Sequence, residues 1–484
     1  MIEINLYINK RKSNYDYFLK KIEMKSRLFF IVLSIFFLLT QCAEKKSLLI
    51  LENVTIIDGT GNLPQPSSDI FIEGGKIIRI CKTGKFEYQE DAEVLTLNNK
   101  YVIPGLIEMH AHMYGPRYYE EVNKTLLAFG ITTVRNPGAS AEEIVAFRKR
   151  LVSGEITGPR IFTAGWLIDG PESPFDYIKV KTEEEIREAV RRQAKVGVDY
   201  IKLYTSLTPS LVKAAIDEAH ALGLEVIGHL GYTSWTFAAN VGIDALLHSA
   251  MAAPLWELMP VEKRDRFYDL ANPTRNFNPD LFKEWGESFD IDGPEMEKLT
   301  KALVDNNVVV DPTLVMMEAM IWGNDSSYKE ILEPDFAPND FTDEWRNNKL
   351  HPYTSWWSDE AFYEAQKLFS VFSEIVKRFY ENGVLITAGT DVGNPWITPG
   401  VSLHREFELL VKAGIPPLEV LKIATYNGAK ALHILGETGT VEVGKQADLV
   451  ILDSNPIDNI KNSRNIEYVL NKGEIYKPSE LLSK

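Results

Sequence analysis

The stretch KYVIPGLIEMHAHMYG, residues 100–115, places two histidines one residue apart at the end of an apolar run. Successive side chains of a β-strand point to opposite faces, so His110 and His112 share one face if this run is a strand. Two imidazoles held close together in this way can bind a metal ion. They can also be half-buried histidines that hydrogen-bond backbone carbonyls or water, and only ligands elsewhere in the chain decide between these interpretations.

Composition limits the class of partner. The chain has 484 residues, of which 45% are hydrophobic and 25% charged, as in ordinary globular proteins. Asp and Glu outnumber Lys and Arg by 68 to 52, and the formal charge of −16 opposes binding to nucleic acid, which needs a basic surface. With only Cys42 and Cys81, the chain offers neither a disulfide framework nor a thiolate metal cluster. We therefore expect a small-molecule partner, and a homo-oligomer is compatible with the sequence.

The middle of the chain alternates β-branched runs with helical stretches, one of which is PSLVKAAIDEAHALG, residues 209–223. Eight β-α units predict a TIM barrel, here at residues 104–437, with its active site at the C-terminal ends of the strands. A doubly wound open sheet is the alternative α/β fold, but no GxGxxG-type phosphate loop follows the first strand. The eight β-branched runs are VIPGLIEMHAH, GITTVRNPG, RIFTAGWLI, VDYIKLYT, LEVIGHL, DALLHS, VVVDPTL and VLITAGTD.

Both ends of the chain are rich in β-type sequence. SLLILENVTIIDGTG and DIFIEGGKIIRI lie near the start, and GTVEVGKQADLVILD and IEYVLNKGEIY lie near the end. The first pair predicts a small antiparallel unit, and the simplest arrangement pairs the two ends with each other. We therefore predict a small β-sandwich domain built from residues 47–103 and 438–484.

The N-terminus predicts an export signal. Residues 24–42 read MKSRLFFIVLSIFFLLTQC, a positively charged start followed by a short apolar run. This segment resembles a bacterial lipoprotein signal with Cys42 as the lipidated new N-terminus, although Gln41 stands where a small residue is usual. An uncleaved signal anchor is the alternative. We expect an exported protein held at the cell envelope by a lipid anchor, with residues 1–23 as an upstream extension.

Two segments between predicted strands are longer than a single helix, at Met251–Asn307 and Trp322–Phe362. Insertions of this kind in a barrel lie over the active-site face and commonly set substrate choice. Their aromatic residues either line a pocket or seal a helical cap.

Further titratable residues stand at or near the C-terminal ends of other predicted strands. They are Lys202, His229, His248 and Asp391. A lysine buried between Ile201 and Leu203 is costly unless it is neutral, paired or modified. A neutral amine can take up carbon dioxide and become a carbamate, a two-oxygen ligand able to bridge two metal ions. An ion pair with an Asp or a Glu is the alternative for Lys202.

This order of residues, His-x-His, Lys, His, His and Asp, resembles that of the metal-dependent amidohydrolase superfamily. The resemblance extends to NVTIIDGTG and IEGGKII near the start, to VIPGLIEMHAH and GITTVRNPG, and to ATYNGAKALHILGETGTVEVGKQADLVILDSNP near the end. It covers nearly all of residues 48–476. Within the superfamily, the chain looks most like the branch that contains imidazolonepropionase and the prolidase-like Xaa-Pro dipeptidases.

The resemblance implies that six residues hold two divalent metal ions. His110, His112 and Asp391 would bind the inner ion, His229 and His248 the outer ion, and carbamylated Lys202 would bridge them. Zinc is the first choice for such ligands, with manganese, iron or cobalt as alternatives. A hydroxide that bridges the ions would attack the substrate carbonyl. Asp391 would accept its proton and deliver it to the leaving nitrogen.

Three residues are weaker candidates for contact with the substrate. Tyr232 stands three residues after His229, where mononuclear deaminases of the superfamily carry a proton-shuttling Glu, which argues against a deaminase. Tyr232 would then bind the substrate carbonyl or carboxylate, or be a wall residue. Arg135 could bind a substrate carboxylate or form a salt bridge at the barrel rim. His404 could contact the substrate or a ligand, or lie on the surface at a helix N-terminus.

The sequence thus predicts an amidohydrolase that cleaves a C–N bond in a small amide, a cyclic amide or a dipeptide. One alternative is a hydrolase with a single metal ion, in which unmodified Lys202 binds the substrate. The other is an inactive amidohydrolase scaffold that binds a peptide or a partner protein. The presence of all six candidate ligands favours an enzyme.

Overall fold

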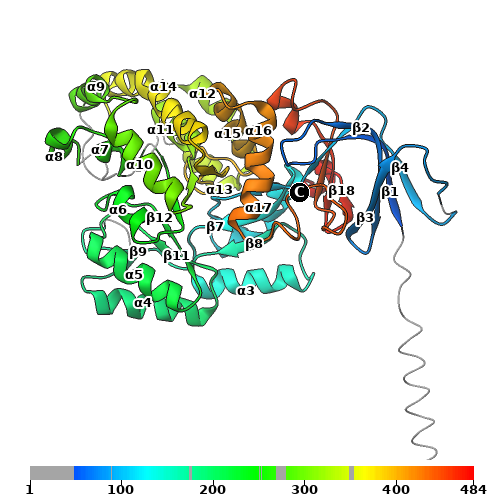
Figure 1. Cartoon of the computed structure of the whole chain (residues 1–484), viewed down its shortest axis with the longest axis horizontal. Helices are drawn as coiled ribbons and strands as arrows, with labels where there is room; N and C mark the ends of the chain where they lie inside the picture. The colour runs from blue at the N-terminus through cyan, green and yellow to red at the C-terminus, as the bar shows by residue number, and fades with distance from the viewer. Residues whose placement is uncertain are drawn as a thin grey trace, which may run out of the picture. The chain divides into compact units, whose positions relative to one another are not determined.

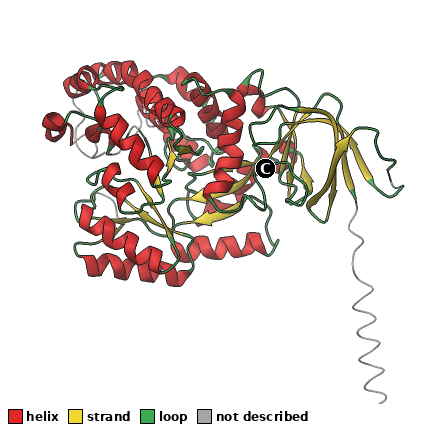
Figure 2. Ribbon diagram, in the orientation of Figure 1, coloured by secondary structure: helices red, strands yellow, loops and turns green. Residues whose placement is uncertain are grey.

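The computed structural model describes residues 48–483, except residues 89, 174–176, 250, 252, 269–278 and 348–353. The predicted upstream extension, signal segment and lipidation site at Cys42 lie outside the described residues. None of the described helices combines the length and the apolar character needed to cross a bilayer. Figure 2 shows the described strands gathered in two regions, one surrounded by helices and one nearly free of them.

The region surrounded by helices is the predicted barrel, whose strands are all parallel. The sheet β6-β7-β8 continues through an isolated bridge between Ala164 and Tyr200 into the sheet that contains β11 to β15. The barrel closes where the Met109 N–H donates to the Ala388 carbonyl at 2.9 Å and where Ala111 pairs with Val392. The strands are β6 (Leu106–Glu108), β7 (Ile131–Asn136), β8 (Arg160–Thr163), β9 (Ile168–Asp169), β10 (Ile178–Lys179), β11 (Tyr200–Leu203), β12 (Glu225–Gly228), β13 (Ala245–Leu247), β14 (Val309–Asp311) and β15 (Leu385–Ile386). The TIM barrel is therefore confirmed.

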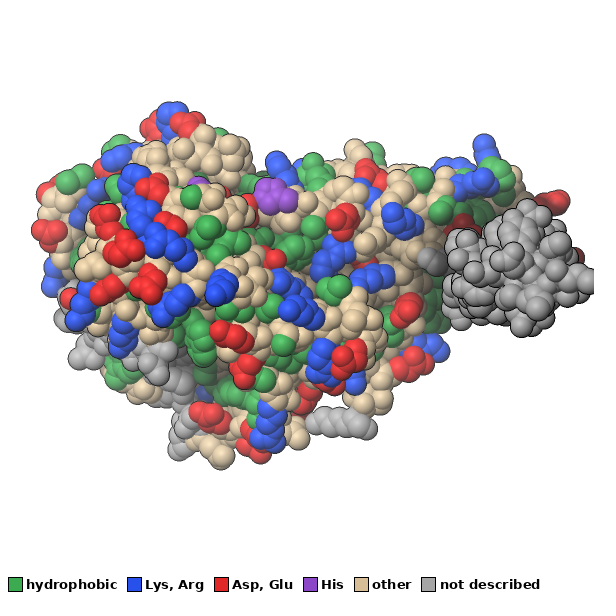
Figure 3. All heavy atoms as spheres, turned by 90° about the horizontal axis from the view of Figure 1, so that it is seen from below, with side chains coloured by type: hydrophobic (Ala, Val, Ile, Leu, Met, Phe, Trp, Pro, Cys, Tyr) green, Lys and Arg blue, Asp and Glu red, His purple; other side chains and the backbone are tan. Residues whose placement is uncertain are grey.

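Helices follow the strands and cover the outside of the barrel (Figure 1). Helix α4 begins with a capping box between Thr182 and Glu185 and ends at Gly197, whose φ of 97° suits a glycine. On the face in Figure 3, acidic and basic side chains are interspersed, and Arg191 of α4 pairs with Glu218 of α5 at 2.7 Å. The covering helices are η1 (Pro116–Tyr118), α2 (Tyr119–Ala128), α3 (Ala141–Val152), α4 (Glu183–Val196), α5 (Pro209–Ala221), α6 (Trp235–Asn240), α10 (Pro294–Asp305), α14 (Asp359–Glu381), α15 (Val401–Lys412), α16 (Pro417–Lys422), the π-helix η6 (Ile423–Asn427) and α17 (Gly428–Ala431).

The two long insertions are mainly helical where they are described. Trp285 is 1% exposed, its indole N–H donates to the Leu255 carbonyl, and its ring stacks on Phe289. These contacts are typical of a helical cap that is sealed by its own aromatic residues. Besides α10 and the first residues of α14, the insertions contain α7 (Pro254–Glu257), η2 (Val261–Lys263), α8 (Arg264–Phe267), α9 (Pro279–Ser288), α12 (Ser326–Ile331), η4 (Pro334–Phe336) and α13 (Asn339–Asn347), and α11 (Leu314–Ile321) lies between the two insertions.

The second region is an eight-stranded sheet that contains strands from both ends of the described chain, drawn in blue and red in Figure 1. The two ends join where β5 runs antiparallel to β16, with Tyr101 opposite Leu452 and Pro104 opposite Leu449. The first strand, β1, pairs parallel with β4 and β5, so the N-terminal part is mixed rather than purely antiparallel. The strands are β1 (Leu49–Ile56), β2 (Gln65–Glu73), β3 (Lys76–Lys82), β4 (Glu93–Thr96), β5 (Tyr101–Pro104), β16 (Leu449–Leu452), β17 (Ile466–Asn471) and β18 (Glu474–Tyr476), with η7 (Ile460–Arg464) and α18 (Pro478–Leu481) beside them.

This sheet is curled, so that its two hairpin turns meet. Gly75, between β2 and β3, lies so close to the Lys472 carbonyl, between β17 and β18, that a Cβ at position 75 would approach the oxygen to 2.4 Å. The φ of 79° at Gly75 also favours glycine. Inside the curl lies a cluster of buried aliphatic side chains that includes Leu51, Ile70 and Leu449. The predicted sandwich is therefore one sheet folded over its own hydrophobic core.

Candidate functional site

All six candidate metal ligands line one cavity of about 180 Å³ at the C-terminal ends of the barrel strands. They come from five strands of the barrel, because His110 and His112 share one strand and each of the other four belongs to a strand of its own. His110 and His112 follow β6, Lys202 lies in β11, His229 and His248 follow β12 and β13, and Asp391 follows β15. The structure thus brings together the six residues that were predicted from their positions at the ends of strands.

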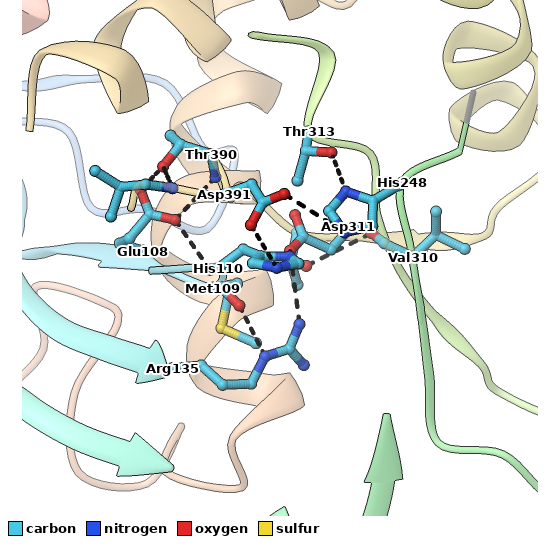
Figure 4. Close-up of polar contacts among 12 residues, drawn as sticks. Glu108, Met109, His110, Arg135, His248, Val310, Asp311, Thr313, Thr390 and Asp391 are labelled. Carbon is cyan, nitrogen blue, oxygen red and sulfur yellow. Dashed lines mark hydrogen bonds and ion pairs between the residues drawn. The ribbon is translucent and has the colours of Figure 1, made fainter. Parts of the chain in front are cut away.

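The Asp391 carboxylate lies beside His110 and His248 (Figure 4). Its Oδ1 is 3.2 Å from His110 Nε2 and 3.4 Å from His112 Nε2, and its Oδ2 is 3.8 Å from His248 Nε2. The His229 ring completes the row, with its centroid 4.5 Å from that of His248. His110, His248 and Asp391 each offer one ligand atom, and these three atoms lie within 4.8 Å of one another. They are close enough to bind one cation.

The backbone around Asp391 is shaped to admit these side chains. Asp391 and His248 both have a φ of 66°, a left-handed conformation that costs a non-glycine residue on the order of 1 kcal/mol. At Gly389, in the TAGTD motif, a Cβ would lie 2.5 Å from Asp311 Oδ2 and 2.7 Å from His110 Cβ. Only glycine therefore lets the last barrel strand approach the histidines of the first.

Hydrogen bonds on the far side of three imidazoles direct their Nε2 atoms to the cavity. His112 Nδ1 lies 3.0 Å from the Gly138 carbonyl, which can only accept, so Nδ1 carries a proton and Nε2 faces Asp391. His248 Nδ1 lies 2.7 Å from Thr313 Oγ1, and His110 Nδ1 lies 3.2 Å from Asp311 Oδ2. Among the described residues, the buried His110 Nε2 makes no hydrogen bond of good geometry, and its neighbour is Asp391 Oδ1 at 3.2 Å. These orientations fit a divalent metal ion, which binds neutral imidazole and carboxylate ligands.

Burial determines the charge states in the cavity. Lys202 is 1% exposed, and burial lowers the pKa of its ammonium to about 7, although Asp391 opposes the shift. Burial, together with Lys202, lowers the pKa of His229 to about 3. Burial, together with His229, lowers the pKa of His248 well below its usual value. Burial alone would raise the pKa of Asp391, but His110 and His248 hold it well below the usual range. His229 and His248 are therefore neutral and Asp391 is ionised near neutral pH, as metal ligands require.

The alternative in which Lys202 pairs with a carboxylate is not observed within the described part of the chain. The ion pairs of the described residues link Asp391 to histidines and Asp311 to His110 and Arg135, but none includes Lys202. Burial favours the neutral form of this amine.

Asp311 is a functional residue that sequence reasoning missed. It ends β14, is fully buried, and holds His110 through Nδ1 while the Arg135 guanidinium lies 3.6 Å from the same carboxylate oxygen. Figure 4 shows Arg135 reaching this pair from below and also donating from Nε to the Met109 carbonyl. A sequence signal did exist, since an Asp directly after the apolar run VVV needs a partner in the barrel.

Glu108 is a second missed residue, and it ties the two ligand-bearing loops together. Its fully buried carboxylate accepts hydrogen bonds from the His110 N–H at 2.9 Å and from the Thr390 N–H and hydroxyl at 3.0 Å each. Burial raises the pKa of Glu108 well above the usual value. One side chain thus fixes the backbone of His110 and of Thr390, the residue before Asp391.

Asp311→Asn should weaken metal binding by about 10–100-fold, because the amide orients His110 less firmly and leaves Arg135 without its counter-charge. The measurement is a metal titration of the stripped variant, followed by calorimetry or by competition with a chelator. Asp305→Asn, on the exposed end of α10, is the matched control and should bind metal as the wild type does. Equal affinity in Asp311→Asn and the wild type would contradict the positioning role.

The structure does not bring the three weaker candidates to the cavity. Arg135 is 2% exposed and lies beneath the histidines in the barrel interior, so it neither faces the substrate space nor forms a rim salt bridge. Tyr232 donates its hydroxyl to Glu172 at 2.9 Å and packs on the Tyr268 ring, outside the cavity lining. His404 is buried between the Phe129 carbonyl and the Ser463 hydroxyl rather than exposed at a helix end.

His404→Gln should reduce stability and leave kcat/KM near the wild-type value. Burial lowers the pKa of His404 to about 3, whereas the unfolded chain takes up a proton near the usual 6.5. The stability from neutral His404 is therefore full above about pH 6.5 and is lost as the pH falls towards 3. Between about pH 7 and pH 5 the wild type should lose about 2 kcal/mol more than His404→Gln in urea unfolding. A selective change in KM would instead indicate contact with the substrate.

Comparisons with known proteins give a family and a fold. The model of the amidohydrolase family matches residues 101–243 and 358–477. An imidazolonepropionase of Brevibacillus brevis is 41% identical over 78 residues, which are 16% of this chain and 18% of that enzyme. A 5-methylthioadenosine/S-adenosylhomocysteine deaminase of Thermoanaerobacter pseudethanolicus is 36% identical over 96 residues, or 18% of this chain and 22% of that enzyme. The matches thus span less than a quarter of either relative.

A solved structure shares the fold over most of its length. The crystal structure of a Xaa-Pro dipeptidase with bound methionine in the active site superposes with a TM-score of 0.65 at 21% sequence identity. The match covers 89% of this chain and 100% of that one. At this identity the likeness establishes the barrel with its β-rich domain.

Proposed function

Because the chain belongs to the amidohydrolase family, we propose that it is a metal-dependent hydrolase that cleaves a C–N bond in a small amide, a cyclic amide or a dipeptide. One observation carries the proposal: four histidines, a buried lysine with a lowered pKa and a buried aspartate with a lowered pKa converge on one cavity at the barrel mouth. This set of groups matches the requirements of divalent metal ions and of hydrolysis.

The residues that would hold the ions are those of the cavity. His110, His112 and Asp391 would hold one ion and His229 and His248 a second, and zinc suits these ligands best. Such ions, when bound, polarise a carbonyl as Lewis acids and supply an activated water near neutral pH. The Asp391 carboxylate, buried and ionised, would take the proton of the attacking water and pass it to the leaving nitrogen.

Lys202 would enter this chemistry as a neutral amine. Because its pKa is about 7, the Lys202 amine is neutral and carries a free lone pair in a large fraction of the protein molecules at neutral pH. The nitrogen can then attack carbon dioxide, forming an N–C bond and releasing one proton, which gives an anionic carbamate. That anion would offer one oxygen to each ion and would offset their positive charge.

The location of the protein is part of the proposal. The charged and apolar segment at residues 24–42 and Cys42 support export and lipid anchoring at the cell envelope. Labelling of cells with a radioactive fatty acid should mark the wild type and not Cys42→Ser.

The function is tested by metal analysis and by a substrate panel. Purified protein supplemented with zinc, manganese or cobalt should contain two ions per chain, whereas one ion would favour the mononuclear alternative. The panel contains N-acyl amino acids, cyclic amides and dipeptides that include Xaa-Pro sequences, and release of amine is measured with and without a chelator. Chelator-sensitive hydrolysis is the expected result. A protein that binds no ion after supplementation and hydrolyses nothing would be the inactive scaffold.

A further inference from the structure

The walls of the metal cavity carry no cationic side chain beyond the candidate ligands themselves, within the part of the chain that is described. Six other side chains line it: Leu167, Tyr177, Tyr204, Met251, Met316 and Asn394. They offer aliphatic, thioether, phenol and amide groups, and none is an Arg, a Lys or a His. The Tyr177 and Tyr204 rings pack edge to face with centroids 5.3 Å apart, and Tyr204 packs in the same way on His229.

Arg135, the basic residue predicted to bind a substrate carboxylate, points away from the metal cavity. Arg135, which the sequence suggested as a carboxylate partner, directs its guanidinium to the Met109 carbonyl and to Asp311 beneath His110. Lys202 lines the same cavity as a member of the candidate ligand set. No fixed positive charge of the described residues therefore faces the part of the cavity beyond the ligands.

This matters because a carboxylate is costly to bury. Sites that recognise a substrate carboxylate supply a guanidinium or an ammonium, which replaces the lost water with charge-assisted hydrogen bonds. A carboxylate that packs on these walls without a cationic partner loses part of its hydration and gains no charge-assisted hydrogen bond in return. Here it would also share the cavity with the Asp391 carboxylate. Thioether and aromatic walls, by contrast, adapt to an uncharged group of varied shape.

We infer that the substrate of this site has no free carboxylate and presents an uncharged, apolar or aromatic group to the walls formed by Leu167, Tyr177, Tyr204, Met251 and Met316. The inference rests on the proposed function and narrows it. It selects neutral amides and cyclic amides over dipeptides with a free C-terminus and over N-acyl amino acids.

Matched substrate pairs test this inference. Each pair consists of an N-acyl amino acid and its carboxamide, with the same acyl group and side chain, and the metal-loaded protein should hydrolyse the carboxamide with a kcat/KM at least about tenfold higher. An equal or higher kcat/KM for the free acids would overturn the inference and leave the proposed function standing. If neither member of any pair is hydrolysed, the proposed function fails, and binding of both members measured by calorimetry then decides the inference. Tighter binding of the carboxamide supports it, and equal or tighter binding of the acid overturns it.

A charge introduced into the wall provides the second test. Met251 is only partly buried, so Met251→Arg can place a guanidinium at the cavity without burying it fully. This variant should shift the preference towards the free acid by about tenfold, whereas the neutral control Met251→Gln should keep the preference for the carboxamide. Thermal unfolding of both variants checks that they are folded. An unchanged preference in a folded Met251→Arg, alongside acids already favoured by the wild type, would show that a carboxylate is bound elsewhere and would overturn the inference.

Discussion

Asp391→Asn is expected to lower kcat by about a thousandfold or more, because the amide cannot accept the proton that the carboxylate takes from the attacking water. The same substitution removes an anionic ligand atom that lies 3.2 Å from His110 Nε2 and 3.4 Å from His112 Nε2. Turnover of the best substrate and the metal content of the purified variant are measured together. Loss of turnover at unchanged metal content would assign the effect to proton transfer alone.

The control for Asp391→Asn is the same chemical change at a remote carboxylate. Asp217 on α5 is exposed and pairs with Lys213 one helical turn away, so Asp217→Asn should keep wild-type kcat. Thermal unfolding should show both variants folded. Wild-type activity in Asp391→Asn would show that the proposed role of this carboxylate is wrong.

Lys202→Met is expected to lower kcat/KM by about a hundredfold or more and the metal content from two ions to about one. Methionine fills nearly the same buried space and cannot form a carbamate, so the two ions would lose the ligand that joins them. The matched control is Lys213→Met on the exposed face of α5, which should change neither quantity. Two tightly bound ions in Lys202→Met would contradict the bridging role.

The pH dependence of metal loading gives an independent measure of Lys202. Carbamate forms only from the neutral amine, whose pKa is about 7, so loading with two ions should be complete above this pH and should fall as the pH drops below it. Added bicarbonate should speed the loading of stripped wild-type protein and should have no effect on Lys202→Met. Loading that is independent of bicarbonate in the wild type would favour an unmodified lysine.

Much of the fold follows from periodicity and from the rules of strand order. Apolar runs separated by helical stretches predict parallel strands, and eight of them predict a closed barrel, which the structure confirms. The resemblance to the amidohydrolase superfamily is confirmed as well. The candidate ligands could be predicted without any knowledge of side-chain packing, because the C-terminal ends of barrel strands converge on one face. His229 after β12 and Asp391 after β15 are examples.

The residues that hold the ligands in place could not be predicted from strand ends. Arg135 stands at a strand end like the histidines, yet its long side chain turns inward to Asp311, and sequence spacing does not distinguish the mouth of a barrel from the layer below it. His404 is fixed by Phe129 and Ser463, which lie 275 and 59 residues away along the chain. Partners at such separations come from tertiary packing and leave no local pattern.

The pairing of β5 with β16 has a consequence for biosynthesis. Residues 101–104 leave the ribosome early, yet their partners at 449–452 are made only after the whole barrel has been synthesised. Until then, the β1-β2-β3 hairpins and one edge of β5 present unpaired backbone groups and the aliphatic faces of Leu51 and Ile70 to the surroundings. A nascent chain with such an edge is prone to pair with other chains, so completion of the sheet is the step at which protection by chaperones matters most.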